Sequence, residues 1–250
     1  MVSIIINKKR VFNFIDMSLF SKIWNYRGYL RYIFQSIYFN FHYLPLRQAV
    51  KLPVLVYKMT FHATRGRVII DAPVIKTGMI QLGQHMVSIY PNNGIVWDQH
   101  GGEVIFHGVC QIGGDSAVSF GKNTVVEFGD LFCASASWKC VSYRGIVFGD
   151  RTRFGWNTMI MDTNFHSLYD MKAKKFACAS GKIVIGHDNW FSTDCRVLHS
   201  TVTPEHCVFA MGSIVTPKSQ MDSYCLMGGS PVRILKRDVM RIFGKNADDE

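Results

Sequence analysis

From residue 185 the chain reads Ile185-Gly186-His187-Asp188-Asn189-Trp190-Phe191, and a large side chain then returns at every sixth position. Six consecutive positions keep this period: Ile185, Phe191, Val197, Thr203, Phe209 and Val215. An α-helix repeats about every 3.6 residues and a two-sided strand about every 2, so neither explains the spacing. A chain that turns a corner every six residues does explain it, because each face of a triangular coil then points one apolar side chain inward.

The same spacing is present upstream, interrupted by two breaks. The inward positions there are Phe128, Ala134 and Cys140, followed by Phe148, Phe154 and Ile160. Glycine followed by a short polar residue, as in Gly129-Asp130 and Gly149-Asp150, suits the corners of such a coil. The breaks predict loops at residues 141–146 and 161–182. We expect function in the longer loop, because it interrupts otherwise regular coils.

The positive charge of the chain is concentrated at its N-terminal end. The formal net charge is +10, and residues 1–70 contain eleven lysines and arginines against one acid, Asp16. Bases and acids are equal in number over residues 71–250. A function argued from the overall isoelectric point of about 9.3 would therefore be misdirected, since the basicity belongs to one segment.

Aromatic residues crowd this basic segment. Its apolar side chains recur three and four residues apart, which predicts a basic amphipathic helix: Phe20, Ile23, Trp24, Leu30, Ile33, Phe34, Ile37, Tyr38 and Phe41. Two interpretations stay open: peripheral contact with an anionic membrane through residues 1–45, or burial of the aromatic face against the protein or a sister subunit. No run reaches the roughly 20 apolar residues of a spanning helix, and residues 1–7 do not read as a signal peptide. Nucleic acid is not expected as a partner, because no binding motif accompanies the basic residues.

Residues 181–236 resemble the terminal coils of the hexapeptide-repeat acyltransferases. The resemblance rests on the residue 185–190 hexapeptide, on Ala210-Met211-Gly212-Ser213-Ile214-Val215-Thr216 and on Gly228-Gly229-Ser230-Pro231-Val232-Arg233-Ile234-Leu235-Lys236. Upstream, Asp162-Thr163-Asn164-Phe165-His166-Ser167-Leu168 is similar to the active-site loop of members that O-acetylate bacterial surface polysaccharides. This resemblance implies a left-handed β-helix, acetyl-CoA as acyl donor, and a homotrimer whose active sites are completed by neighbouring subunits.

We therefore expect a mainly β chain, built as a left-handed parallel β-helix of hexapeptide repeats with a helical segment at each end. Residues 1–65 are expected to form the basic aromatic N-terminal segment, residues 66–227 the β-helix, and residues 228–250 a short C-terminal helix and tail. The C-terminal helix is expected at Ser230-Pro231, because serine is a common N-cap and proline suits the first helical position.

The expected chemistry is transfer of an acetyl group to a hydroxyl of a sugar or surface-polysaccharide precursor. Such a transfer needs a general base, and the resemblance assigns this role to His166, at the start of the long loop. Asp162 is the nearest carboxylate in sequence and would fix the tautomer of His166, although a backbone carbonyl would serve equally well. Outside this context, a lone histidine is more simply a loop or packing residue.

Coenzyme A needs backbone N–H groups and cations along a groove. The candidates are Trp190, Gly212, Ser213, Thr216, Pro217, Lys218, Arg233 and Lys236. The glycine and its neighbours suit close approach of the pantetheine arm, and the basic residues suit the phosphates. Two simpler interpretations stand beside these: Lys236 as part of an ordinary solvated helix face, and Trp190 as a residue that fills a corner of the coil.

Three other observations limit the classes of function that the sequence allows. Seven cysteines without a C-x-x-C pair indicate neither a zinc ribbon nor a complete disulfide framework, and they fit a reducing cytoplasm. A β-helical zinc carbonic anhydrase would need three convergent histidines, two of them five residues apart, and the chain has no such pair, so no metal is expected. A noncatalytic β-helix serving as a scaffold or ligand-binding protein remains the alternative.

Overall fold

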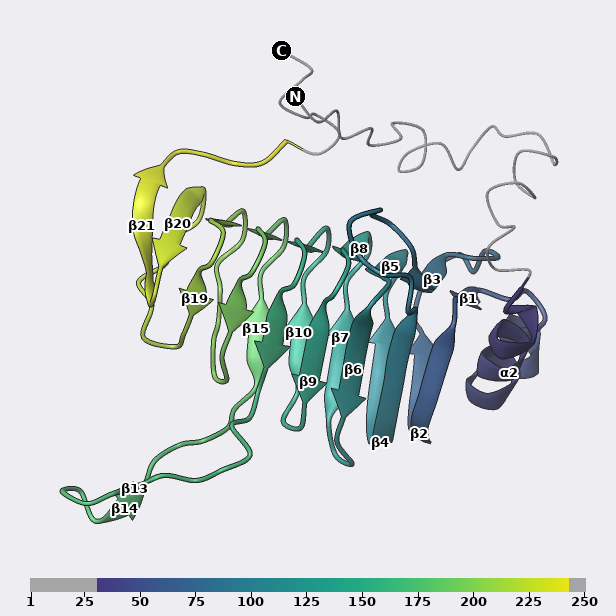
Figure 1. Ribbon diagram of the computed structural model, residues 1–250, viewed down its shortest axis with the longest axis horizontal. Coiled ribbons are helices and arrows are strands. Elements are labelled where there is room, and N and C mark those ends of the chain that lie inside the picture. The colour runs from purple at the N-terminus through teal and green to yellow at the C-terminus, as the bar shows by residue number, and fades with distance from the viewer. Residues whose placement is uncertain (1–30, 243–250) are drawn as a thin grey trace.

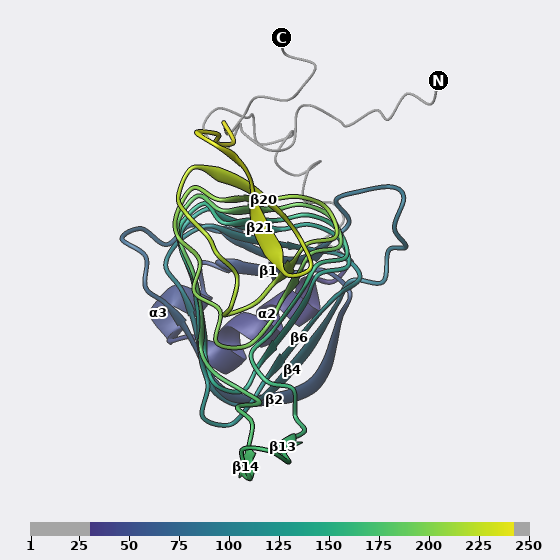
Figure 2. The same cartoon turned by 90° about the vertical axis from the view of Figure 1, so that its left-hand side faces the viewer.

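Successive segments of the chain stack as parallel coils along one long axis, as the computed structural model shows (Figure 1). The structure describes residues 31–242. Seen along the axis, the coils share one roughly triangular outline (Figure 2). The architecture is a parallel β-helix, as the period of six predicts.

The strands of the coils are arranged on three faces. The first face contains β1 (Val54–Val56), β3 (Ile80–Gln84), β5 (Cys110–Gly113), β8 (Phe132–Ala134), β11 (Arg153–Phe154), β16 (Trp190–Phe191), β18 (Val208–Phe209) and β20 (Cys225–Gly229). The second contains β6 (Ser116–Phe120), β9 (Lys139–Ser142), β12 (Met159–Met161), β17 (Arg196–Val197) and β19 (Ile214–Val215). The third contains β7 (Val125–Phe128), β10 (Ile146–Phe148) and β15 (Ile183–Ile185). Two long strands, β2 (Met59–Ile70) and β4 (Ile95–Phe106), span the second and third faces, and β4 pairs with both β6 and β7.

The residues of the six-residue frame fill the interior of the coil. All twelve inward positions are buried, and none exposes more than 4% of its surface. Their aromatic rings stack from coil to coil, with centroids 4.6 Å apart for Phe154 and Phe191 and 4.2 Å apart for Phe191 and Phe209. The corners of successive coils also stack closely. A Cβ added to Gly149 would lie 2.6 Å from the backbone nitrogen of His187, so only glycine fits at this corner.

Thr203, the polar member of the frame, is buried with its hydrogen bonds satisfied. Its Oγ1 accepts hydrogen bonds from the backbone N–H of Gly186 at 3.1 Å and from Nδ2 of Asn189 at 2.8 Å. Asn189 Oδ1 in turn accepts a bond from the backbone N–H of Cys207 at 2.6 Å. Threonine is tolerated here because it hydrogen-bonds the turn of the preceding coil.

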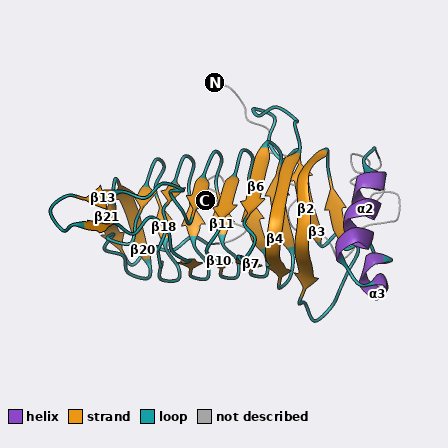
Figure 3. Cartoon of the chain, turned by 90° about the horizontal axis from the view of Figure 1, so that it is seen from below, coloured by secondary structure: helices purple, strands orange, loops and turns teal. Residues whose placement is uncertain are grey.

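Two helices, α2 (Ile33–Tyr43) and α3 (Leu46–Ala49), stand at the N-terminal end of the coil (Figure 3). The inward side of α2 carries Phe39 together with two polar residues, Ser36 and Asn40, all fully buried. Its aromatic side faces outward, with Phe34 80% and Phe41 50% exposed. Within the described residues, therefore, the Phe34 and Phe41 rings are left largely uncovered, although Tyr38 contacts Phe61. The predicted helix over residues 20–30 lies outside the described residues.

The predicted C-terminal helix is wrong. Residues Val232–Arg237 form strand β21, which pairs antiparallel with β20 and covers the open edge of the first face. The buried side chain of Val232 and the packing of Ile234 against the core stabilise the extended conformation. The β-helix also begins at Val54, before the expected boundary at residue 66.

Candidate active site

The long loop interrupts the corner between the second and third faces. It leaves β12, forms a small hairpin from β13 (Tyr169–Asp170) and β14 (Lys175–Phe176), and returns at β15. This segment, residues 163–180, is called the arm below, and it projects away from the coils (Figures 1 and 2). Its base is closed by the antiparallel bridge between Thr163 and Ser180 and by a 2.9 Å hydrogen bond from Gly181 N–H to Asp162 O. The predicted loop and its place in the coil are therefore present.

Asp162 lies at the base of the arm and is fully buried. Its carboxylate accepts a hydrogen bond from the Ser142 hydroxyl at 2.8 Å. It also accepts three from the backbone N–H groups of residues 143, 144 and 145, at 2.7 to 2.8 Å. The carboxylate thus closes the turn of the preceding coil. Within the described residues no hydrogen bond joins it to His166, so its predicted role as the orienting partner has no supporting contact.

His166 lies at the start of the arm with its side chain exposed. Its backbone N–H donates to Asn164 O at 2.7 Å. The preceding residue, Phe165, has a φ of 59° and sets its ring edge-on against Tyr143, with centroids 5.0 Å apart. The imidazole is therefore accessible to a substrate, and its own chain supplies little to exclude water from it.

A cleft of about 410 Å³ opens at the same corner, on the coils before the arm. It is lined by His100, Lys122, Asn123, Tyr143 and Arg144. His100 Nε2 lies 3.0 Å from Asp98 Oδ1, and Ser119 donates to Asp98 Oδ2 at 2.9 Å. This cleft has no signal in the sequence, because its residues are spread over 45 positions and only the coil brings them together.

The residues predicted to bind coenzyme A are distributed over the C-terminal coils. Gly212 has a φ of 73°, and nothing lies within 4 Å of where its Cβ would stand, so its backbone is open to close approach. Thr216 and Lys218 follow β19, at the corner that carries the arm, and the Lys218 side chain is exposed. Ser213, by contrast, is fully buried, and its hydroxyl donates to Ala210 O at 2.5 Å. The Ser213 side chain is therefore not available to a ligand.

Trp190 faces outward from β16 and is half-buried. The guanidinium carbon of Arg241 lies 4.5 Å above its ring, a cation–π contact with the chain that follows β21. Burial, together with the nearby charge of Arg153, lowers the pKa of Arg241 below its ordinary value. The ring that was predicted to meet the cofactor thus already packs against a cation of its own chain.

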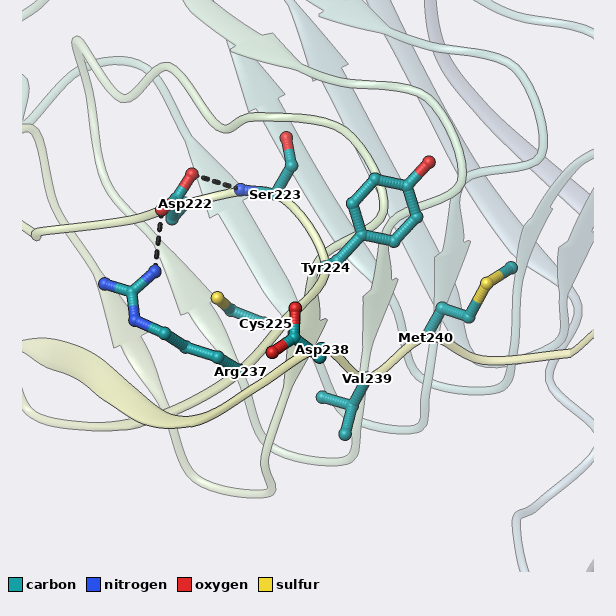
Figure 4. Close-up of a pocket in the computed structure, with 8 residues that line it drawn as sticks. All are labelled: Asp222, Ser223, Tyr224, Cys225, Arg237, Asp238, Val239 and Met240. Atoms are coloured by element: carbon teal, nitrogen blue, oxygen red, sulfur yellow. Dashed lines mark hydrogen bonds and ion pairs between the residues drawn. The ribbon is translucent and has the colours of Figure 1, made fainter.

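Arg233 and Lys236 lie on β21 and are exposed. A hollow of about 390 Å³ opens between the start of β20 and the end of β21, and neither Arg233 nor Lys236 lines it (Figure 4). Across it, the Arg237 guanidinium donates to Asp222 Oδ2 at 2.7 Å. The strand places these cations on the first face, whereas Thr216 and Lys218 lie at the corner between the other two faces. The structure therefore does not gather all the predicted cofactor residues into one groove.

Residues 31–242 contain no group of three histidine, cysteine, aspartate or glutamate side chains that could hold a metal ion. In the same part of the chain, no helix has the length and hydropathy to cross a bilayer.

Comparison with known proteins gives distant structural similarities. No family model and no curated protein matches the chain. Among solved structures, the polySia specific acetyltransferase NeuO is 17% identical, with 77% of this chain and 76% of that chain covered and a TM-score of 0.48. AntD, an N-acyltransferase from Bacillus cereus in complex with dTDP and 3-hydroxybutyryl-CoA, is 13% identical over 78% and 89%, with a TM-score of 0.36. A maltose O-acetyltransferase from Clostridium difficile 630 is 11% identical over 84% and 86%, with a TM-score of 0.35. Similarity at this level assigns neither an activity nor a substrate to this chain.

Proposed function

We propose that the chain is a coenzyme-A-dependent O-acyltransferase that moves an acetyl group to a hydroxyl of a sugar or surface-polysaccharide precursor. One observation carries the proposal: a regular β-helix is interrupted at one corner by an arm that presents an accessible histidine, His166, beside a polar cleft. A rigid scaffold with one exposed loop is a common design for placing reactive side chains.

In this proposal His166 handles the proton. The neutral imidazole takes the proton of the acceptor hydroxyl as the oxygen attacks the thioester carbonyl, and it then returns the proton to the leaving sulfur. Acetyl-CoA supplies the activated acyl group. The open backbone at Gly212 and the exposed amine of Lys218 suit its pantetheine arm and phosphates. The Asp162 carboxylate is engaged with residues 142–145 and forms no hydrogen bond to His166 within the described residues.

We further propose that a neighbouring copy of the chain covers this site, within a homotrimer. The arm exposes large apolar side chains that its own coil does not bury: Phe165, Leu168, Tyr169, Met171 and Phe176. Apolar groups on a projecting segment favour contact with another surface. A second subunit over the arm would exclude water from His166 and complete the groove for the donor.

The outward face of α2 suggests a second partner, and we propose that it meets an anionic membrane surface. The face presents Phe34, Ile37, Tyr38 and Phe41. It lies in a stretch, residues 31–70, that contains six lysines and arginines and no acid. Aromatic side chains beside cations are typical of helices that lie in the headgroup region of a bilayer.

The enzymatic proposal is tested by the release of free thiol from acetyl-CoA in the presence of a panel of sugars and polysaccharides. We expect His166→Ala to lower kcat at least about 100-fold, the effect of removing a general base. The matched control is His62→Ala, since His62 is an exposed histidine on β2 outside the arm. Unchanged turnover in His166→Ala would refute the assigned base, and absence of any acceptor-dependent release would favour the noncatalytic scaffold.

A further inference from the structure

The cleft beside the arm is built from one corner of three successive coils. His100 lies at the bend of β4, Lys122 and Asn123 lie between β6 and β7, and Tyr143 and Arg144 lie between β9 and β10. The arm leaves the same corner one coil later. At the base of the arm, the buried Asp162 carboxylate accepts hydrogen bonds from the backbone of residues 143–145 and so holds them in place.

The cleft and the arm that carries His166 are adjacent. Phe165, the residue before His166, packs its ring against Tyr143 of the cleft, and Arg144 Nε donates to the hydroxyl of Ser180 at the other end of the arm at 2.9 Å. Both ends of the arm are therefore tied to residues that line the cleft. A ligand bound in the cleft would reach the loop that carries the proposed base.

The charges around the cleft are unbalanced. Of the acids at this corner, Glu103 is paired with Arg67, and the buried Asp162 carboxylate is covered by its four hydrogen bonds. Asp98, which contacts His100 and Ser119, leaves one negative charge beside the cleft, against the two cations that line it, Lys122 and Arg144. Neither Lys122 nor Arg144 forms an ion pair with any residue between 31 and 242. Further cations continue along the corner, with Arg65 opposite His100 in the strand register and the Lys182 side chain 3.6 Å from the position of a Cβ on Gly145.

We infer that this cleft binds an anionic group of the acceptor, a carboxylate or phosphate, so that the acceptor is an acidic saccharide. The inference rests on the proposed function and names its substrate class. Lys122 and Arg144 supply the charge, and the fork of donors on an arginine matches a carboxylate or phosphate in two contacts. A sugar ring has hydroxyl groups and an apolar face. The Asn123 amide can hydrogen-bond the hydroxyl groups, and the Tyr143 ring can contact the apolar face. The acid group anchored there would place a hydroxyl of the same or the next residue near His166.

The test is a binding titration of the full-length protein without acetyl-CoA, at low ionic strength where charge interactions are least screened. The probes are tetragalacturonate and its fully methyl-esterified form, which has the same sugars and length without the charge. We expect the acid to bind at least about tenfold more tightly than the ester, a difference of roughly 1.4 kcal/mol. Lys122→Gln and Arg144→Gln should each abolish most of that preference, and Arg144→Lys, which keeps the charge without the fork of donors, should retain part of it. Lys76→Gln, which removes one exposed charge at a different corner, should change nothing.

The outcomes separate this inference from the proposed function. Equal affinity for acid and ester would overturn the inference. It would also be overturned if Lys76→Gln lost as much of the preference for the acid as Lys122→Gln does, since that would reflect diffuse attraction to the net charge. An unchanged preference in both Lys122→Gln and Arg144→Gln would also overturn it, because the cations of the cleft would then not be responsible. If the protein acetylates neutral and acidic saccharides equally well, the cleft assignment fails while the acyltransferase stands. If acidic saccharides bind as expected but no acyl transfer occurs with any acceptor, the acyltransferase fails while the anion site stands.

Discussion

The side chain of Asn40 and the backbone of Val54 exchange two hydrogen bonds, as two neighbouring strands would. Asn40 Nδ2 donates to Val54 O at 2.7 Å, and the Val54 N–H donates to Asn40 Oδ1 at 3.1 Å. Ser36 forms the same reciprocal pair with Val56, and Gln35 forms it with Met59. Three polar side chains of α2 thus replace a missing strand along β1 and the first residue of β2. An open edge of this kind would otherwise offer unpaired N–H and C=O groups to another chain.

Asn40→Ala should therefore destabilise the protein strongly. Two backbone groups of Val54 would lose their partners in a fully buried position, which we expect to cost about 2 to 3 kcal/mol of the free energy of unfolding. Urea denaturation followed by circular dichroism measures this loss. Phe41→Ser, on the outward side of the same helix, is the control and should change stability by no more than about 0.5 kcal/mol. A small effect of Asn40→Ala would mean that water replaces the amide at the edge.

The six-residue frame could be predicted from the sequence, whereas the orientation of α2 could not. The six-residue frame was readable because each inward position is decided by local repetition, and all twelve positions are buried. The orientation of α2 was not readable, because a hydrophobic stripe predicts an inward apolar face. The polar side instead faces inward because the edge of β1 needs donors and acceptors more than it needs apolar contact.

Asp162→Ala should lower stability more than any substitution of His166. Its removal leaves the hydroxyl of Ser142 and three backbone N–H groups without an acceptor, and we expect a loss of at least about 3 kcal/mol. His166→Ala should stay within about 0.5 kcal/mol, because the side chain is exposed. Denaturation of both variants gives the comparison. Asp162→Asn keeps one acceptor oxygen but sets its amide N–H against the backbone N–H of residue 143, so its loss of stability should be smaller than that of Asp162→Ala. A shifted pH–rate profile in this variant would show that Asp162 acts on His166.

The acid at the base of the arm shows the limit of motif resemblance for the site. Asp162 and His166 are four residues apart, and the sequence offered Asp162 as the nearest carboxylate to orient His166, with a backbone carbonyl as an equal alternative. The coil instead stacks Asp162 over residues 142–145, a contact across about 20 positions that no local pattern signals. The cleft escaped prediction for the same reason, since His100, Lys122 and Arg144 meet only when the corners are stacked. The C-terminal hairpin escaped because Ser230-Pro231 carries a local helix signal, whereas the open edge of β20 is a long-range feature.

The pairing of Arg151 with Asp188 should make stability depend on acid pH. Arg151 donates to the two carboxylate oxygens at 2.6 and 2.7 Å and joins the coils before and after the arm. These hydrogen bonds hold the pKa of Asp188 below its ordinary value. The ionised carboxylate therefore stabilises the fold at pH values above about 4, and this contribution is lost as the pH falls through the lowered pKa. Asp188→Asn should cost about 1 kcal/mol at pH 7, since Arg151 is partly exposed to water.

Denaturation of wild type and Asp188→Asn between pH 7 and pH 2 checks the sign. The difference in unfolding free energy should shrink steadily below pH 4 as the wild-type carboxylate becomes protonated. Asp170→Asn, in the exposed hairpin of the arm, removes the same charge without an arginine pair and serves as the control. A difference that persists undiminished at the lowest pH would show that the pair does not act through ionisation.

The outward face of α2 predicts binding to anionic vesicles. Deleting residues 1–45 would be a poor test, because it would also remove Ser36 and Asn40 from the edge of β1. The double variant Phe34→Ser/Phe41→Ser leaves the edge pairing intact and removes two rings that are 80% and 50% exposed. Each buried ring contributes on the order of 1 to 2 kcal/mol at a bilayer surface, so vesicle binding of the variant should fall at least tenfold.

The measurement is co-sedimentation with vesicles of phosphatidylcholine alone or with phosphatidylserine, followed by sizing of both proteins in solution. Wild type should sediment with the anionic vesicles and lose most of that binding in high salt, because the lysines and arginines of the segment act through long-range charge. Equal sedimentation of wild type and double variant would remove the aromatic face from the interaction. If the double variant instead changes the oligomeric state and leaves vesicle binding unaltered, the face is a contact between copies of the chain. The two interpretations that the sequence left open would then be decided in favour of subunit packing.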